Sequence, residues 1–219
     1  MAARFLDDAG RAAFKEAIEA IEAASAAEVV VALRQQSSGH LLANLVVGGV
    51  GAFAALAYML YSAHQFSLPA ILIDPFVLGA ALGWLVELVP PLKRRLVPAG
   101  RRRHAVERGA KAAFFDRGVA NTRGRTGVLV YLSWLEQDAV VLADSGVPAA
   151  WRDGARKELE AQLTAAMPHG GARVAEVLRG AVATLGAQAP RASDDINELP
   201  NALDDELAAS RRARKGAPR

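Results

Sequence analysis

The sequence predicts a small α/β domain that is interrupted by a two-helix transmembrane hairpin. Hydrophobic residues make up 52% of the 219 residues, and they are concentrated between residues 41 and 89. Such a concentration is typical of membrane spans rather than of a plain globular domain. The segments on both sides of this stretch carry the periodicities of amphipathic helices and of buried strands. They are short enough to form one small domain together.

The first part of the α/β domain is assigned to residues 1–36. Phe14, Ile18 and Ile21 recur at helical spacing, and Asp7 can cap the helix that they predict. The β-branched run at residues 28–33 predicts a buried strand. The N-terminal residues include several acidic side chains and no apolar run, so a cleaved signal peptide is not expected.

The hairpin is assigned to residues 37–97, with spans at about 41–61 and 68–89. About 20 helical residues match the thickness of a bilayer core of about 30 Å. The second span contains Asp74 and Glu87, which we expect at the outer and inner interfaces respectively. The alternative is an ion or proton relay inside the membrane.

Small residues in both spans predict close packing of the two helices. Gly79 and Gly83 form a GxxxG motif in the second span, and Gly48 and Gly51 lie at small-residue spacings in the first. Glycine lets helix backbones approach closely, which is how helices associate in lipid. The same motif is also used for self-association, so the sequence leaves the oligomeric state open.

Basic residues predict the topology of the hairpin. Arg34 precedes it and a cluster between Lys93 and Arg103 follows it, whereas the turn at residues 62–67 has no Lys or Arg. The positive-inside rule then predicts a two-span protein of the cell inner membrane with both termini in the cytoplasm. The lipid bilayer is the expected partner, and other membrane proteins are further candidates. Nucleic acid is not expected, because the basic cluster lies beside an apolar span.

The second part of the α/β domain is assigned to residues 98–189, and a charged tail without apolar pattern, predicted to be disordered, to residues 190–219. Within the second part, apolar periodicity and turn residues predict two strands joined as a hairpin and three helices. The strands are expected at residues 126–134 and 138–144, and the helices at about 106–115, from Pro148 onward, and at 174–185.

Several of these segments resemble the TPM-domain (TPM phosphatase-like) family. The resemblance covers residues 5–34 and 100–188, with the hairpin as an insertion known from a bacterial membrane branch. It rests on the following residues: 27–31 (AEVVV), Phe114, Gly118, Thr122, 125–133 (RTGVLVYLS), Glu136, 141–144 (VLAD), Gly146 and Val147.

The resemblance implies a TPM-like α/β sandwich, with helices packed against a small central sheet. Some members of the family resemble phosphatases or bind calcium, so a divalent cation such as calcium is an implied cofactor. The chain departs from the family at Ser145, where an arginine usually follows the aspartate. If that arginine binds an anion in other members, this chain lacks the contact.

The standard catalytic signatures are missing from the sequence. There is no cysteine, which excludes disulfides, thiolate nucleophiles and zinc–cysteine sites. Walker A, HExxH and GxSxG motifs are also absent. The histidines lie in separate segments without a metal-ligand partner at suitable spacing, at His40, His64, His104 and His169.

The best candidate site lies where the two predicted strands begin and end. Arg123 and Arg125, with Thr122, are candidates for binding a phosphate-like anion through charge-assisted hydrogen bonds. Asp144 is the candidate catalytic or metal-binding carboxylate. The alternative is a structural Asp–Arg pair that closes the strand hairpin, with Thr122 capping a turn. Glu136 and Asp138 are expected at the other end of the hairpin. Asp144 follows six residues later, about 20 Å away at the rise of a strand, so a single calcium site that uses all three is not expected.

Two main functions follow from the sequence, and whether the protein is an enzyme is left open. The first is a membrane-anchored interaction or membrane-protein quality-control module. The second is a metal-assisted phosphatase-like hydrolase at the membrane surface, with Asp144 and the arginine loop as its site. Transport through an oligomer of the hairpin is a third hypothesis.

Overall fold

The computed structural model describes residues 5–37, 41–191 and 203–205. The chain divides into two compact units, one formed by Met1–Ser37 with Arg103–Arg219 and the other by Ser38–Arg102. The first unit contains the sheet with its covering helices, and the second contains the apolar helical hairpin. The predicted fold class, an α/β domain interrupted by two apolar helices, is confirmed.

The α/β unit is built on a four-stranded sheet with the order β3-β2-β1-β4. Its strands are β1 (Glu28–Arg34), β2 (Gly127–Ser133), β3 (Asp138–Ala143) and β4 (Leu203–Asp205). β1 runs parallel to β2 along its whole length, and β2 runs antiparallel to β3. The predicted hairpin of β2 and β3 is confirmed, whereas nothing in the local pattern had identified β1 as the other neighbour of β2.

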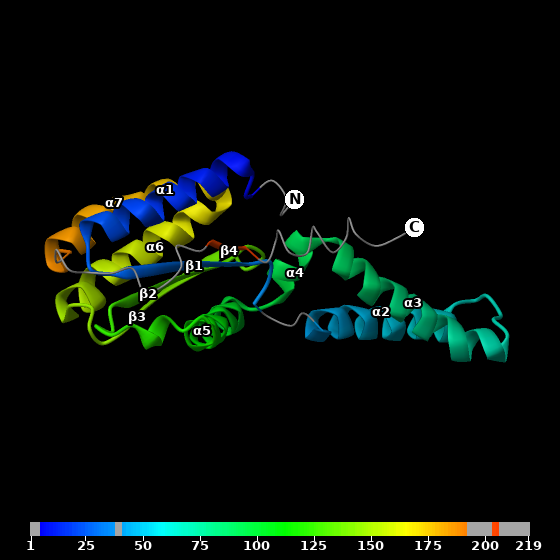
Figure 1. Ribbon diagram of the computed structural model, residues 1–219. Helices are drawn as coiled ribbons and strands as arrows, with labels where there is room; N and C mark the ends of the chain where they lie inside the picture. Colours follow the sequence, from blue (N-terminus) through cyan, green and yellow to red (C-terminus); the bar gives the residue numbers. More distant parts are fainter. Residues whose placement is uncertain (1–4, 38–40, 192–202, 206–219) are drawn as a thin grey trace, which may run out of the picture. The chain divides into compact units, whose positions relative to one another are not determined.

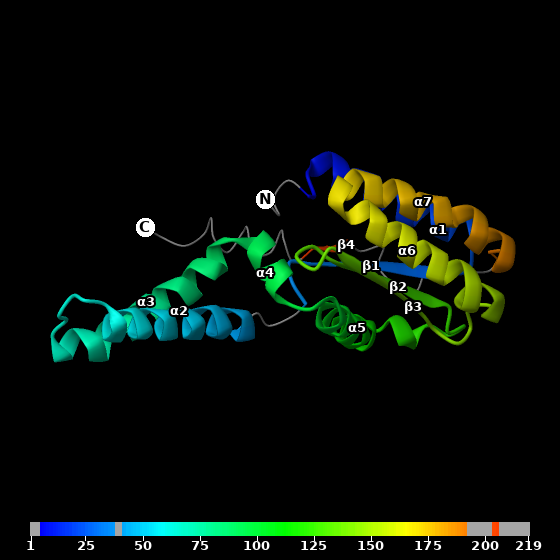
Figure 2. The same ribbon diagram turned by 180° about the vertical axis from the view of Figure 1, so that it is seen from behind.

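Helices cover both faces of this sheet (Figures 1 and 2). On one face lie α1 (Asp8–Ala24), α6 (Arg156–Ala166) and α7 (Gly171–Gln188), and on the other lies α5 (Ala99–Asp116). Val29 and Val31 pack into the core on the first face, and Val30 and Ala32 into the core on the second. Burial on both faces explains why β1 reads as a continuous apolar run rather than an alternating one.

The first helix forms as its sequence predicts. The side chain of Asp7 accepts a hydrogen bond of 2.7 Å from the backbone N–H of Gly10, which satisfies one of the free donors at the start of α1. Phe14, Ile18 and Ile21 are fully buried against the sheet. Amphipathic spacing and the capping residue together therefore account for this helix.

The segment after β3 is less regular than the single helix expected from Pro148. A π-helical turn (Trp151–Ala155) precedes α6, and a 3-10 turn (Met167–His169) follows it. Another 3-10 turn (Val119–Asn121) lies earlier in the chain, before β2. The π-helical turn places Trp151 wholly inside the core of the first face. The departure from α-helical geometry thus occurs where this large side chain is buried.

The structure corrects the prediction of a wholly disordered tail. Leu203–Asp205 forms β4 and pairs in parallel with β1, with Val31 opposite Leu203 and Leu33 opposite Asp205. Leu203 packs against the core, which adds apolar burial to a short strand. The sequence of this segment has no strand-like pattern. It forms a strand because it pairs with the edge of β1, not because of its local propensity.

The second unit consists of α2 (Leu41–Tyr61), α3 (Leu68–Leu88) and α4 (Pro90–Leu96). Two 19-residue stretches, Ala43–Tyr61 and Leu68–Val86, each have a mean hydropathy of 1.8 and are long and apolar enough to cross a membrane. Large apolar side chains point outward on both helices, and Phe53 and Trp84 are 74% and 66% exposed. This outward apolar surface is the reverse of a soluble helix pair.

Glycines bring α2 and α3 into backbone contact. A Cβ atom at Gly48 would lie 2.7 Å from the carbonyl oxygen of Gly79, and one at Gly83 would lie 2.8 Å from that of Asn44. Gly51 differs, because a side chain there would meet the flexible end of Leu82 instead of backbone. Gly48, Gly79 and Gly83 are therefore the positions at which the helix pair requires a glycine.

Candidate functional site

The predicted site lies at the end of the sheet where β2 begins and β3 has ended. Arg125 Nε donates a hydrogen bond of 3.3 Å to Asp144 Oδ2, and the backbone N–H of Ser145 donates one of 2.6 Å to Asp144 Oδ1. The carbonyl of Arg125 accepts from the N–H of Gly146 at 2.9 Å. The two loops are thus tied together by side-chain and backbone contacts.

The other predicted residues of this site have different surroundings. Thr122 is buried, and its Oγ1 accepts a hydrogen bond of 3.0 Å from the N–H of Thr126, so its hydroxyl closes the loop. Arg123 and Arg125 are both exposed on that loop. Arg125 has a positive φ of 53°, a conformation that residues other than glycine adopt less often. The structure therefore brings Arg125 and Asp144 together and turns Thr122 inward.

Asp144 is held in its ionised form. Its partial burial raises the pKa of the carboxyl, but the hydrogen bond from Ser145 and the guanidinium of Arg125 outweigh this effect and lower the pKa below its ordinary value. A carboxylate of this kind can orient a cation or a water molecule, but it does not serve as a general acid at neutral pH.

The residues at this end of the sheet do not fit a calcium site. Calcium takes six to eight oxygen ligands, usually with several carboxylates among them. Within residues 5–37, 41–191 and 203–205, no group of three His, Asp or Glu side chains is placed to hold a metal ion. The nearest charged partner of Asp144 is the guanidinium of Arg125, which repels a cation.

A second polar cluster surrounds Glu136 at the opposite end of the strand hairpin. Glu136 is 3% exposed. Its Oε2 accepts a hydrogen bond of 2.6 Å from Ser133 Oγ, and both carboxylate oxygens lie 3.2 Å from the N–H of Ser37. The Ser37 hydroxyl also lies 3.0 Å from that of Tyr131. This cluster fixes the position of Ser37, in the segment that follows β1 and precedes the helical hairpin.

A third cluster, centred on Arg103 of α5, lies along the outer edge of β3. Arg103 pairs with Asp138 at 2.9 Å, with Glu107 at 3.1 Å and with Glu160 of α6. Partial burial lowers the pKa of Arg103, but its hydrogen bond with Glu160 and the charge of Asp138 outweigh this and raise the pKa above its ordinary value. The guanidinium stays charged and joins two helices to one strand.

Neither of these clusters was predicted from the sequence. Ser133 and Glu136 are three residues apart across a tight turn, which is a local signal that was available. The partners of Arg103 are spread over residues 107 to 160, and only the packing of α5 and α6 against the sheet brings them together. No local pattern in the sequence identifies such a cluster.

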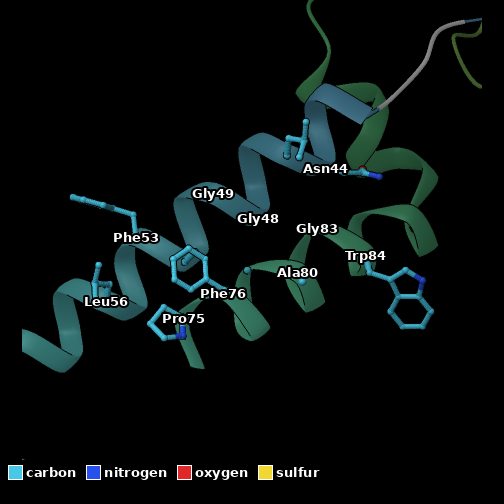
Figure 3. Close-up of a pocket in the computed structure, with 13 residues that line it drawn as sticks. Asn44, Gly48, Gly49, Phe53, Leu56, Pro75, Phe76, Ala80, Gly83 and Trp84 are labelled. Atoms are coloured by element: carbon cyan, nitrogen blue, oxygen red, sulfur yellow. The ribbon is translucent and has the colours of Figure 1, made fainter. Parts of the chain in front are cut away.

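The hairpin carries a shallow apolar groove of about 620 Å³ between α2 and α3. Small residues line it where the helices meet, including Gly48 and Gly83, and Phe53, Phe76 and Trp84 are among its larger lining residues (Figure 3). The lining is apolar apart from Asn44. Such a surface suits lipid chains or another apolar helix, and it offers no group for chemistry on a polar substrate.

Comparisons with known proteins give one structural likeness. No family model matches the chain, and no curated protein matches it. Among solved structures, the NMR structure of the BA42 protein from the psychrophilic bacterium Bizionia argentinensis is similar, with a TM-score of 0.53 and 17% sequence identity. The match covers 90% of this chain and 92% of that one. It supports the α/β fold, while the resemblance to the TPM-domain family stays a prediction.

Proposed function

We propose that this chain is a membrane-anchored interaction module of the bacterial inner membrane, with its α/β unit in the cytoplasm. The observation that carries the proposal is the build of the hairpin. Its two helices are apolar over 19 residues each, pack through glycine backbones and direct large apolar side chains outward. Lipid is the environment that suits such a surface, because soluble proteins rarely leave so large an apolar surface exposed to water.

The pairing of β1 with β2 supports an even number of membrane crossings. β1 precedes the hairpin and β2 follows it, yet the two strands pair along seven residues. Both must therefore lie on the same side of the bilayer. The basic residues of α4, Lys93, Arg94 and Arg95, favour the cytoplasmic side.

The state of Asp144 favours an interaction role over hydrolysis. Both carboxylate oxygens already accept a hydrogen bond, one from Arg125 and one from Ser145. A metal-assisted phosphatase needs carboxylates that are free to coordinate its ions. The exposed Arg123 and Arg125 still suit an anion, so the hydrolase is tested directly alongside the proposal.

The topology is tested by cysteine labelling, for which a chain without cysteine is well suited. Gln65→Cys in the turn between α2 and α3 is expected to react with a membrane-impermeant maleimide in spheroplasts. Lys111→Cys, exposed on α5, is expected to react only after the membrane has been permeabilised. Labelling of Lys111→Cys in intact spheroplasts, or release of the protein by carbonate washing, would contradict the proposal.

The hydrolase is tested on the purified full chain in detergent. Turnover of p-nitrophenyl phosphate is measured with calcium, with magnesium and with a chelator, for the parent chain and for Asp144→Asn. If the proposal is right, the parent chain shows no metal-dependent turnover that is lost in Asp144→Asn. If such turnover appears and is lost in Asp144→Asn, the enzyme hypothesis replaces the interaction hypothesis.

A further inference from the structure

We infer that the edge of β1 facing β4 is a binding site for an extended segment of a partner protein that carries an apolar residue followed by an acidic one. In this chain, Leu203 and Asp204 of the C-terminal segment occupy the site. The inference rests on the proposed interaction role and names the class of partner. The two edges of the sheet, the side chains of β4 and the shortness of its pairing support it.

The opposite edge of the sheet is closed by side chains. Along β3, Arg103 donates to the carbonyl of Ala139 at 2.8 Å, and Arg156 donates to the carbonyl of Val141 at 2.8 Å. Glu160 accepts from the N–H of Val141 at 2.9 Å, and Thr164 from that of Ala139 at 3.2 Å. Backbone groups that another strand would need are therefore already used, which is a common way to prevent edge pairing.

The edge of β1 is instead closed by a strand. β4 pairs in parallel with Val31, Ala32 and Leu33, three of the seven residues of β1. Three residues are fewer than the five or six of an average strand, so the pairing contributes few backbone hydrogen bonds. A segment held this way is well placed to exchange with a longer one, as in binding by strand addition.

Side chains of the α/β unit recognise the occupant on both faces of the sheet. Asp204 Oδ2 lies 2.6 Å from Arg34 Nη2 and 2.5 Å from Arg117 Nη2. Arg34 ends β1, and Arg117 directly follows α5. The side chains of Arg34 and Asp204 are 17% and 18% exposed, so this pair is shielded from water more than a surface ion pair.

The residue before the acid is read on the other face. Leu203 packs against the core that α1 and α7 cover, next to Val31 of β1. Because side chains alternate across a strand, one leucine-like residue and one acid in succession contact opposite faces of the sheet, the first the apolar core and the second the two arginines. The site therefore selects an extended apolar–acidic pair, whereas a helix or a basic segment does not fit it.

The tail and a partner segment compete for the same edge. A segment of the same chain acts at a high effective concentration, on the order of millimolar, so it masks the site from weak ligands. Removing the tail, or breaking the ion pairs of Asp204, is expected to open the edge for a segment supplied in trans.

The test uses the full chain in detergent and a fluorescein-labelled peptide with the sequence of residues 198–207, ELPNALDDEL. Fluorescence anisotropy is expected to show at least about tenfold tighter binding to a chain that ends at Ser193 than to the full chain. Should the shortened chain fold poorly, the full-length Asp204→Lys variant opens the same edge without a deletion. Equal binding by all three chains would overturn the inference.

Matched arginine variants of the shortened chain, and of Asp204→Lys, test the recognition. Arg117→Glu is expected to weaken binding of the peptide about tenfold or more, whereas Arg108→Glu, exposed on α5, leaves it unchanged. A peptide in which lysine replaces the residue equivalent to Asp204 is expected to bind neither the shortened chain nor the Asp204→Lys chain. Equal effects of the two arginine variants would show non-specific charge attraction and refute the site.

Two further outcomes separate this inference from its alternatives. If the full chain is a dimer by light scattering and the shortened chain is a monomer, a second copy supplies the strand and the partner-segment inference is wrong. If the peptide binds neither chain while Gln65→Cys and Lys111→Cys label as expected, the site is refuted and the membrane-anchored proposal stands.

Discussion

Val31 of β1 and Val130 of β2 are register partners in neighbouring parallel strands, although the whole apolar hairpin lies between them in the chain. A parallel pair needs a long crossover connection, and here that connection contains α2, α3, α4 and α5. The hairpin is therefore inserted into a crossover of the α/β unit. This arrangement connects both ends of the hairpin to one sheet.

Gly79→Leu is expected to destabilise the hairpin by about 1–3 kcal/mol, because a side chain there meets the backbone of Gly48 and the Cβ of Ala52. Gly49→Leu is the matched control, since a Cβ at Gly49 meets nothing within 4 Å. The measurement is unfolding in mixed micelles of increasing SDS fraction, followed by tryptophan fluorescence. Equal midpoints for the two variants would show that the helices do not pack as described.

Trp151→Ala is expected to lower the free energy of unfolding of the α/β unit by about 3–5 kcal/mol, because the side chain is fully buried. Trp151→Phe is expected to lower the free energy of unfolding much less. Within the described part of the chain, the indole Nε1 has no hydrogen-bond partner, so phenylalanine gives up volume but no hydrogen bond. Urea unfolding of the detergent-solubilised chain by circular dichroism compares the two, and equal losses would contradict this account.

Glu160→Ala is expected to destabilise the α/β unit by about 1–3 kcal/mol. It removes the acceptor of the Val141 N–H and leaves the partly buried Arg103 with one carboxylate fewer. The freed edge of β3 is also expected to promote concentration-dependent association. Glu158→Ala, exposed on the same helix, serves as the control. Thermal unfolding and light scattering should separate the two variants, and identical behaviour would argue against edge protection.

The pairing of Asp144 predicts a pH dependence of stability. Its pKa is lowered in the folded protein, so the unfolded chain takes up a proton first as the pH falls. The stabilisation is present above the ordinary aspartate pKa of about 3.9 and is lost as the pH falls through the lower folded value. We expect Asp144→Asn to be less stable than the parent by under about 1 kcal/mol near neutral pH, because Arg125 is largely exposed.

Comparing the parent with Asp144→Asn at acidic pH tests the sign of this contribution to stability. The difference in the free energy of unfolding between the parent and Asp144→Asn is expected to shrink below about pH 4. Chemical unfolding at a series of pH values from about 3 to 7 measures it. A difference that stays constant over this range would show that the carboxylate contributes nothing through its charge.

The candidate site was predicted in part. Arg125 and Asp144 lie near each other in the structure, as expected from their places at the ends of two strands that form a hairpin. Their pairing is the structural alternative that the sequence had left open. The same alternative expected Thr122 to cap a turn, and in the structure its Oγ1 accepts a hydrogen bond from the N–H of Thr126.

The sequence by itself determined the type and the limits of most elements. Apolar runs of about 20 residues identify the two membrane-length helices, and local periodicity identifies α1, the β2–β3 hairpin and α7. These features are visible because the physical preference of each segment depends on residues that are close together in the chain.

The tertiary structure alone decided which segments meet. It placed β1 beside β2, added β4 to the edge of β1 and gathered Arg103, Asp138 and Glu160 around one strand. These contacts join residues far apart in the chain, and their free energy comes from burial and charge pairing that exist only after packing. A three-residue strand such as β4 has too little propensity of its own, so its partner determines its structure.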